Sequence, residues 1–71
     1  MKKAVEAVLH WGAKPAQTLE VFNIQGQPLA RYTLDPEARQ YRLPLNQFSS
    51  GIYLLRLTLV NGKTLTARLV K

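Results

Sequence analysis

His10 is the only histidine of this chain, and a catalytic or metal site would have to be built from it and a few carboxylates. Asp and Glu together number four, at widely separated positions, and there is no cysteine. Structural zinc requires thiolates or several imidazoles, and hydrolysis requires a nucleophile within reach of a base. Because no serine or aspartate stands at a recognisable spacing from His10, the sequence predicts no enzyme, no metal site and no cofactor.

The positive charge is the next chemical feature, since ten Lys and Arg residues against four acidic ones give a formal net charge of +6. Such a charge suits an acidic partner such as nucleic acid or a membrane surface. Arginines and tyrosines interleave between Arg31 and Arg42, as they do in proteins that stack single-stranded bases. Tyr41, however, shares its strand face with Leu43 and Leu45, so we expect its ring to point inward. A basic nucleic-acid-binding β domain is therefore the least favoured alternative, and no nucleic acid is expected as a partner.

Apolar and polar residues alternate with a period of two, which is typical of half-buried strands. Six short strands are expected, near residues 4–11, 18–24, 29–34, 40–45, 52–60 and 63–71. Turn residues recur every eight to twelve positions, and no segment shows a helical period. The pattern predicts one all-β domain over residues 1–71, either an antiparallel sandwich or a small barrel.

The alternation also predicts which side chains fill the core. The residues expected to face inward are Val5, Ala7, Leu9, Trp11, Leu19, Val21, Tyr41, Leu43, Leu45, Phe48, Tyr53, Leu55, Leu57, Leu59, Leu65, Ala67 and Leu69. Pro44 cannot donate to a strand ladder, so its strand is expected to lie at an edge or to end there. Asn61-Gly62 predicts a type I′ hairpin turn, in which both central residues have positive φ.

Several blocks agree with a known family in order and spacing. Val21-Phe22-Asn23 followed by Gly26-Gln27 is one block, Ser49-Ser50-Gly51-Ile52-Tyr53 is a second, and Arg68 to Lys71 forms a basic end. Over residues 18–71 this pattern resembles the C-terminal sorting domain of type IX secretion substrates. Phe48 takes the place of the family's usual leucine, and a Tyr-Pro-Asn-Pro-like opening is absent. Residues 1–11 are interpreted as the family's next strand.

The resemblance implies a fold and a function that composition alone does not give. It implies an immunoglobulin-like antiparallel β-sandwich of about six to seven short strands. Such domains direct an attached cargo protein across the periplasm and through the outer-membrane translocon. A surface sortase then removes the domain and joins the cargo to lipopolysaccharide, so the domain is a substrate without catalysis of its own. The chain is accordingly expected to be part of a larger precursor that reaches the cell surface.

The resemblance also implies a recognition motif, for which we name Gly26, Gly51, Tyr53, Gly62, Arg68 and Lys71. Outward Arg68 and Lys71 are expected to offer positive charge to a partner. Gly51 is expected to permit a close backbone approach or a positive φ, and Tyr53 to pack in the core with its hydroxyl at the rim.

Two further expectations concern partners. An exposed strand edge is expected to allow self-association by strand pairing. A small immunoglobulin-like adhesion or carbohydrate-binding module is the main alternative function, and it requires exposed aromatic side chains, whereas the single tryptophan, Trp11, is expected in the core.

Overall fold

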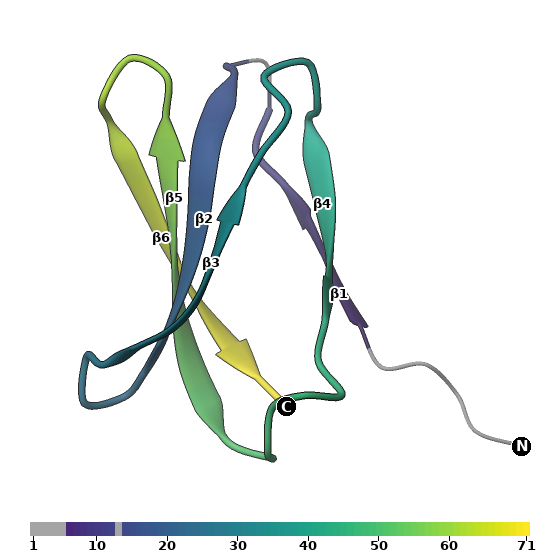
Figure 1. Cartoon of the computed structure of the whole chain (residues 1–71), viewed down its shortest axis with the longest axis vertical. Helices are drawn as coiled ribbons and strands as arrows, with labels where there is room; N and C mark the ends of the chain where they lie inside the picture. Colours follow the sequence, from purple (N-terminus) through teal and green to yellow (C-terminus); the bar gives the residue numbers. More distant parts are fainter. Residues whose placement is uncertain (1–5, 13) are drawn as a thin grey trace, which may run out of the picture.

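The computed structural model describes residues 6–12 and 14–71, and their regular structure consists of six β-strands (Figure 1). The strands are β1 (Glu6–His10), β2 (Ala16–Asn23), β3 (Pro28–Thr33), β4 (Gln40–Pro44), β5 (Ile52–Leu59) and β6 (Thr64–Val70). All six predicted strands are present, and the described residues contain no helix, which confirms the all-β prediction. Within this part of the chain, no helix is long and apolar enough to cross a membrane.

The strands form two antiparallel sheets. One sheet has four strands in the order β3-β2-β5-β6, and the other contains only β1 and β4. In the larger sheet, Leu19 pairs with Leu57 and Val21 pairs with Leu55, so that the central strands β2 and β5 present leucine and valine on the same face. The chain leaves the larger sheet after β3, forms β4 beside β1, and returns to the larger sheet as β5 (Figure 1). Of the two predicted architectures, the structure is the sandwich.

The core lies between the two sheets, as the alternation predicts. Leu19, Val21 and Leu43 are the largest fully buried side chains. The remaining buried apolar residues are Ala16, Leu34, Leu45, Phe48, Tyr53, Leu55, Leu57 and Leu59, and Ala7, Leu9, Trp11 and Tyr41 pack partly against them. The expectation for Val5 lies outside the described residues. Tyr41 packs partly against this core and lies beside Tyr32, with the ring centroids 5.5 Å apart and the rings tilted by 39°, so the inward prediction for Tyr41 is confirmed.

The burial prediction fails along β6. Leu65 is 46% exposed, Ala67 is exposed, and only Leu69 packs against the core. Both exposed residues lie opposite inward residues of β5, with Leu65 beside Leu57 and Ala67 beside Leu55. They therefore face the predicted side, but the two-stranded sheet is too narrow to cover it. A groove of about 200 Å³ remains, bordered by Trp11 and Leu9 of the first segment and by Leu65 and Ala67.

The hairpin at Asn61-Gly62 exists, but its turn differs from the predicted type I′. Among the described residues only glycines have positive φ, so Asn61 does not adopt the conformation that type I′ requires. The Gly62 N–H donates to Leu59 O (2.9 Å), the Leu59 N–H donates to Lys63 O (2.8 Å), and Gly62 has a φ of 90°. This is a three-residue loop that closes on a glycine bulge.

The β2–β3 connection repeats this arrangement. The Gly26 N–H donates to Asn23 O (3.0 Å), the Asn23 N–H donates to Gln27 O (3.0 Å), and Gly26 has a φ of 86°. A side chain with a Cβ rarely adopts such a φ, so this position favours glycine. The two hairpins of the larger sheet thus use the same loop, with glycine at the same place.

Candidate recognition site

One end of the sandwich brings together three segments that are far apart in the sequence (Figure 1). Asn23 at the end of β2 lies opposite Tyr53 near the start of β5, and Tyr53 lies opposite Leu69 of β6. Ile52 pairs with Val70 at the same end. We call this region the C-terminal corner and define it as residues 22–27, 45–54 and 68–71. Apart from Val21, it contains all three sequence blocks that carry the family resemblance.

Lys71 is fixed in the corner by both its backbone and its side chain. The Lys71 N–H donates to Gly51 O (2.9 Å), and the Gly51 N–H donates to Lys71 O (3.2 Å). The ammonium group donates to the carbonyl oxygens of Leu45 (2.8 Å) and Phe48. Lys71 was expected to point outward, but its charge is engaged by the loop between β4 and β5. Its contacts are therefore structural ones, and its contribution to recognition stays a prediction.

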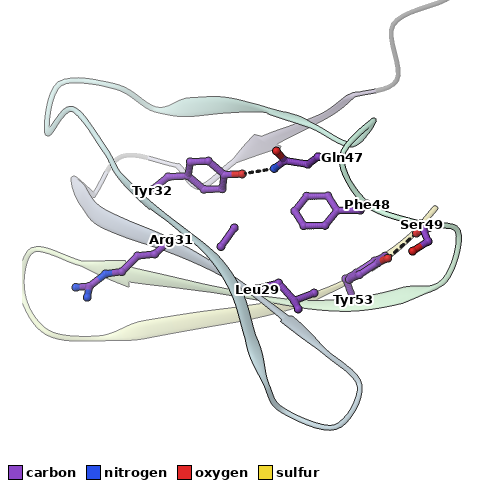
Figure 2. Close-up of a pocket in the computed structure, with 8 residues that line it drawn as sticks. Leu29, Arg31, Tyr32, Gln47, Phe48, Ser49 and Tyr53 are labelled. Atoms are coloured by element: carbon purple, nitrogen blue, oxygen red, sulfur yellow. Dashed lines mark hydrogen bonds between the residues drawn. The ribbon is translucent and has the colours of Figure 1, made fainter.

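Tyr53 has the environment predicted from the sequence. Its side chain is 8% exposed, and its hydroxyl donates a hydrogen bond to Ser49 O at the rim of the sandwich (Figure 2). Its ring packs against Phe48 with the two centroids 5.3 Å apart. Tyr53 thus fastens the loop before β5 to the sheet.

Of the two alternatives expected for Gly51, the structure has the positive φ, at 157°. A Cβ built at this position would have no atom within 4 Å beyond the two neighbouring residues of the chain. A close approach of other atoms therefore does not explain glycine here.

Asn23 organises the turn that holds Gly26, and this role was not predicted. Its side-chain oxygen accepts hydrogen bonds from the N–H groups of Gln25 (3.0 Å) and Gln27 (2.9 Å). Its side-chain NH₂ donates to Gln27 Oε1 (2.8 Å). Asparagine at the first position of a turn commonly bonds to the backbone two residues later, and this preference was the available signal.

Arg68 lies on the outer face of the larger sheet, opposite Leu54. Arg68 is exposed, and it takes part in no ion pair or side-chain hydrogen bond among residues 6–12 and 14–71. Arg56 differs, because it contacts Glu20 (2.8 Å) and stands 5.0 Å from the centre of the Phe22 ring. Because Arg68 lies on the outer face and is exposed, it has the outward placement that the sequence predicts.

Gly62 is not part of the corner. It belongs to the β5–β6 turn at the opposite end of the sandwich, where it forms the glycine bulge (Figure 1). The structure thus brings Gly26, Gly51, Tyr53, Arg68 and Lys71 to one end and leaves Gly62 at the other.

The corner adjoins a hollow of about 600 Å³ between β3 and the loop before β5 (Figure 2). Gln47 Nε2 donates to the Tyr32 hydroxyl (2.8 Å) across it, and Leu29, Phe48 and Tyr53 supply apolar surface. The described residues contain no group of three or more His, Asp or Glu side chains that could hold a metal. Hydrogen-bonding and apolar groups of this kind support binding and do not form an acid–base pair.

Comparison with known families also indicates a binding domain. A family model described as the secretion system C-terminal sorting domain matches residues 4–71. The chain belongs to this family. The sorting domain is thus a type IX, or Por, secretion signal that directs the export of an attached cargo and has no catalysis of its own. No curated protein and no solved structure matches it significantly.

Proposed function

We propose that the C-terminal corner is the surface of this sorting domain that the outer-membrane translocon binds. The main support is the convergence of three sequence blocks at one end of the sandwich, where Asn23 faces Tyr53 and Gly51 pairs with Lys71. In this proposal Gly26, Gly51, Tyr53 and Lys71 maintain the shape of the corner. Arg68 supplies the positive charge that contacts the partner.

The rest of the export route follows from this role. The domain travels through the periplasm at the C-terminal side of its cargo and carries the cargo through the outer membrane to the cell surface. A surface sortase then separates the domain from the cargo. The domain acts throughout as a ligand and substrate of the secretion machinery.

A second contact within this function is self-association through a free strand edge. Among residues 6–12 and 14–71, β6 pairs only with β5, and the groove beside it is lined by Leu65, Ala67 and Trp11. Unpaired edges with neighbouring apolar surface favour the addition of another strand. Two sorting domains in one secretion complex would meet most readily at this edge.

The alternative of an adhesion or carbohydrate-binding module finds less support. Such a module requires exposed aromatic side chains, whereas Trp11 packs partly against the core and Phe48 and Tyr53 are buried. We therefore place recognition by the secretion machinery first.

Export of a fluorescent cargo fused to residues 1–71 tests the proposal in a host that has type IX machinery. Removal of residues 68–71 is expected to abolish export, but it also removes the Lys71 contacts that hold the corner together. Arg68→Glu changes the charge without removing the strand, and it is also expected to abolish export. Lys63→Glu, in the turn at the opposite end, is the matched control and should be exported normally. Equal export of the two charge variants would contradict recognition at the corner.

A further inference from the structure

The outer face of the larger sheet carries an exposed apolar strip that the core does not require. Phe22, Leu54 and Arg68 lie side by side on β2, β5 and β6, and Ile52 pairs with Val70 in the next outward row. Ile52 and Leu54 are 44% and 40% exposed, Val70 is 64% exposed, and Ile24 in the adjoining turn is also 64% exposed. We call these five apolar residues together with Arg68 the outer strip.

The strip is concentrated at one end of its sheet face. Farther along the same strands, the outward positions hold threonines and a salt bridge between Arg56 and Glu20. A hollow of about 440 Å³ lies at the Phe22–Leu54 end of the strip and extends from there to Arg56. Contiguous apolar patches rimmed by polar residues commonly mark sites where another molecule binds.

The charges at the strip indicate what kind of molecule fits. The chain has four carboxylate side chains: Glu6 pairs with Arg42, Glu20 pairs with Arg56, and Asp35 and Glu37 lie in the loop between β3 and β4. None of them forms an ion pair with Arg68 in the part of the chain that the structure describes. An apolar patch with an arginine and an aromatic ring has the composition of a protein–protein interface.

We propose that the outer strip binds a protein surface of the translocon that presents apolar side chains and a carboxylate opposite Arg68. This inference rests on the proposed function and names the chemistry of the partner at the corner. The inward half of the corner, with Tyr53 and Lys71, holds the loop in place, and the outward half makes the contact. A lipid surface is a poorer fit, because an anionic membrane gains affinity from several clustered cations, whereas the strip itself carries only Arg68 and the neighbouring Arg56 is paired with Glu20.

The test measures binding of the cargo fusion to purified, detergent-solubilised type IX translocon. Leu54→Ser combined with Val70→Ser is expected to weaken binding about tenfold or more, and Arg68→Glu is expected to do the same. Val60→Ser with Lys63→Glu, at the opposite end of the sheet, is the matched control and should bind within about twofold of the parent. Circular dichroism and thermal unfolding confirm that each variant is folded, and Arg68→Gln serves as a milder variant should Arg68→Glu fail to fold.

The outcomes separate this inference from the proposed function. Parent-like binding by the folded Leu54→Ser/Val70→Ser variant, with binding still lost in Arg68→Glu, would overturn the apolar strip as the contact and leave the proposed function standing. If the parent fusion neither binds the translocon nor is exported, the proposed function itself fails. Loss of binding to phosphatidylcholine–phosphatidylglycerol vesicles in the strip variants, with translocon binding unchanged, would assign the strip to a membrane and overturn the protein partner.

Discussion

The ammonium group of Lys71 stabilises the loop that leads into β5, because it donates hydrogen bonds to the carbonyl groups of Leu45 and Phe48. These carbonyls lie at a turn in which the Phe48 N–H bonds to Leu45 O (3.0 Å). A single cation thus connects the strand end at Lys71 to the loop that also carries Gly51. The basic residue that the family pattern places at this position is used for architecture here.

Lys71→Met keeps most of the side-chain volume and removes the charge-assisted hydrogen bonds. We expect the free energy of unfolding to fall by about 1–3 kcal/mol, because hydrogen bonds from charged groups are the stronger class. Urea unfolding followed by circular dichroism measures the change. Lys63→Met, at the exposed β5–β6 turn, is the control and should shift stability by less than about 0.5 kcal/mol. Equal losses in both variants would show that the Lys71 contacts are energetically unimportant.

Asn23 and Asn61 lie in the two glycine-bulge hairpins, so their hydrogen bonds can be compared directly. Asn23 makes two hydrogen bonds to backbone N–H groups and one to Gln27 Oε1, whereas Asn61 accepts one from the Lys63 N–H (3.0 Å). Asn23→Ala is therefore expected to cost about 1 kcal/mol and Asn61→Ala about 0.5 kcal/mol. Thermal unfolding of the two variants ranks the costs, and the reverse order would refute this account of the turns.

At the scale of the elements, alternation was sufficient to predict all six strands and the inward faces of β2 and β5. Leu19, Val21, Leu55 and Leu57 are buried as predicted, because both strands lie in the middle of the larger sheet. The same reasoning failed for Leu65, since periodicity indicates the side to which a residue points and not whether another layer covers that side. The type I′ prediction for the turn at Asn61-Gly62 is also wrong. The two-residue type I′ loop and the three-residue loop with a glycine bulge share this dipeptide, and they differ in which residues have positive φ.

Leu57 and Leu65 are cross-strand partners with very different burial, at 8% and 46% exposure. Leu57→Ala is expected to destabilise the domain by about 2–5 kcal/mol, because it leaves a cavity between the sheets. Leu65→Ala should cost less than about 1 kcal/mol, since its side chain borders an open groove. Guanidinium unfolding of the two variants provides the comparison. A large loss for Leu65→Ala would show that something covers β6 in solution.

At the scale of the whole molecule, the candidate site arises only when the sheet is assembled. The family resemblance pointed to Gly26, Gly51, Tyr53, Arg68 and Lys71, but they are spread over more than half of the chain. These residues come together only because β2 pairs with β5 and β5 pairs with β6. The registers of those two pairings cannot be predicted from a single sequence. The role of Lys71 was missed for the same reason, because its acceptors lie in a loop more than twenty residues away.

The two sheets also predict an uneven distribution of stability. In the described part of the chain, β2 and β5 each pair with two neighbours, whereas β1 and β4 pair only with each other. Amide hydrogen exchange is therefore expected to be slowest in the centre of β2 and β5, around Val21 and Leu55, and faster in β1 and β4. Exchange measured by NMR tests this order. Uniform protection across both sheets would mean that the domain opens only as a single cooperative unit.

The reciprocal backbone pair between Gly51 and Lys71 has one more consequence. It forms only when the final strand lies beside β5, and the hydrogen bonds from the Lys71 ammonium group to Leu45 and Phe48 form only then. An unfolded or partly folded chain would contain all residues of the motif, but it would not present the surface that they form together in the folded domain. A translocon that binds this corner would therefore select for folded sorting domains, because it would export only cargo whose sorting domain has finished folding.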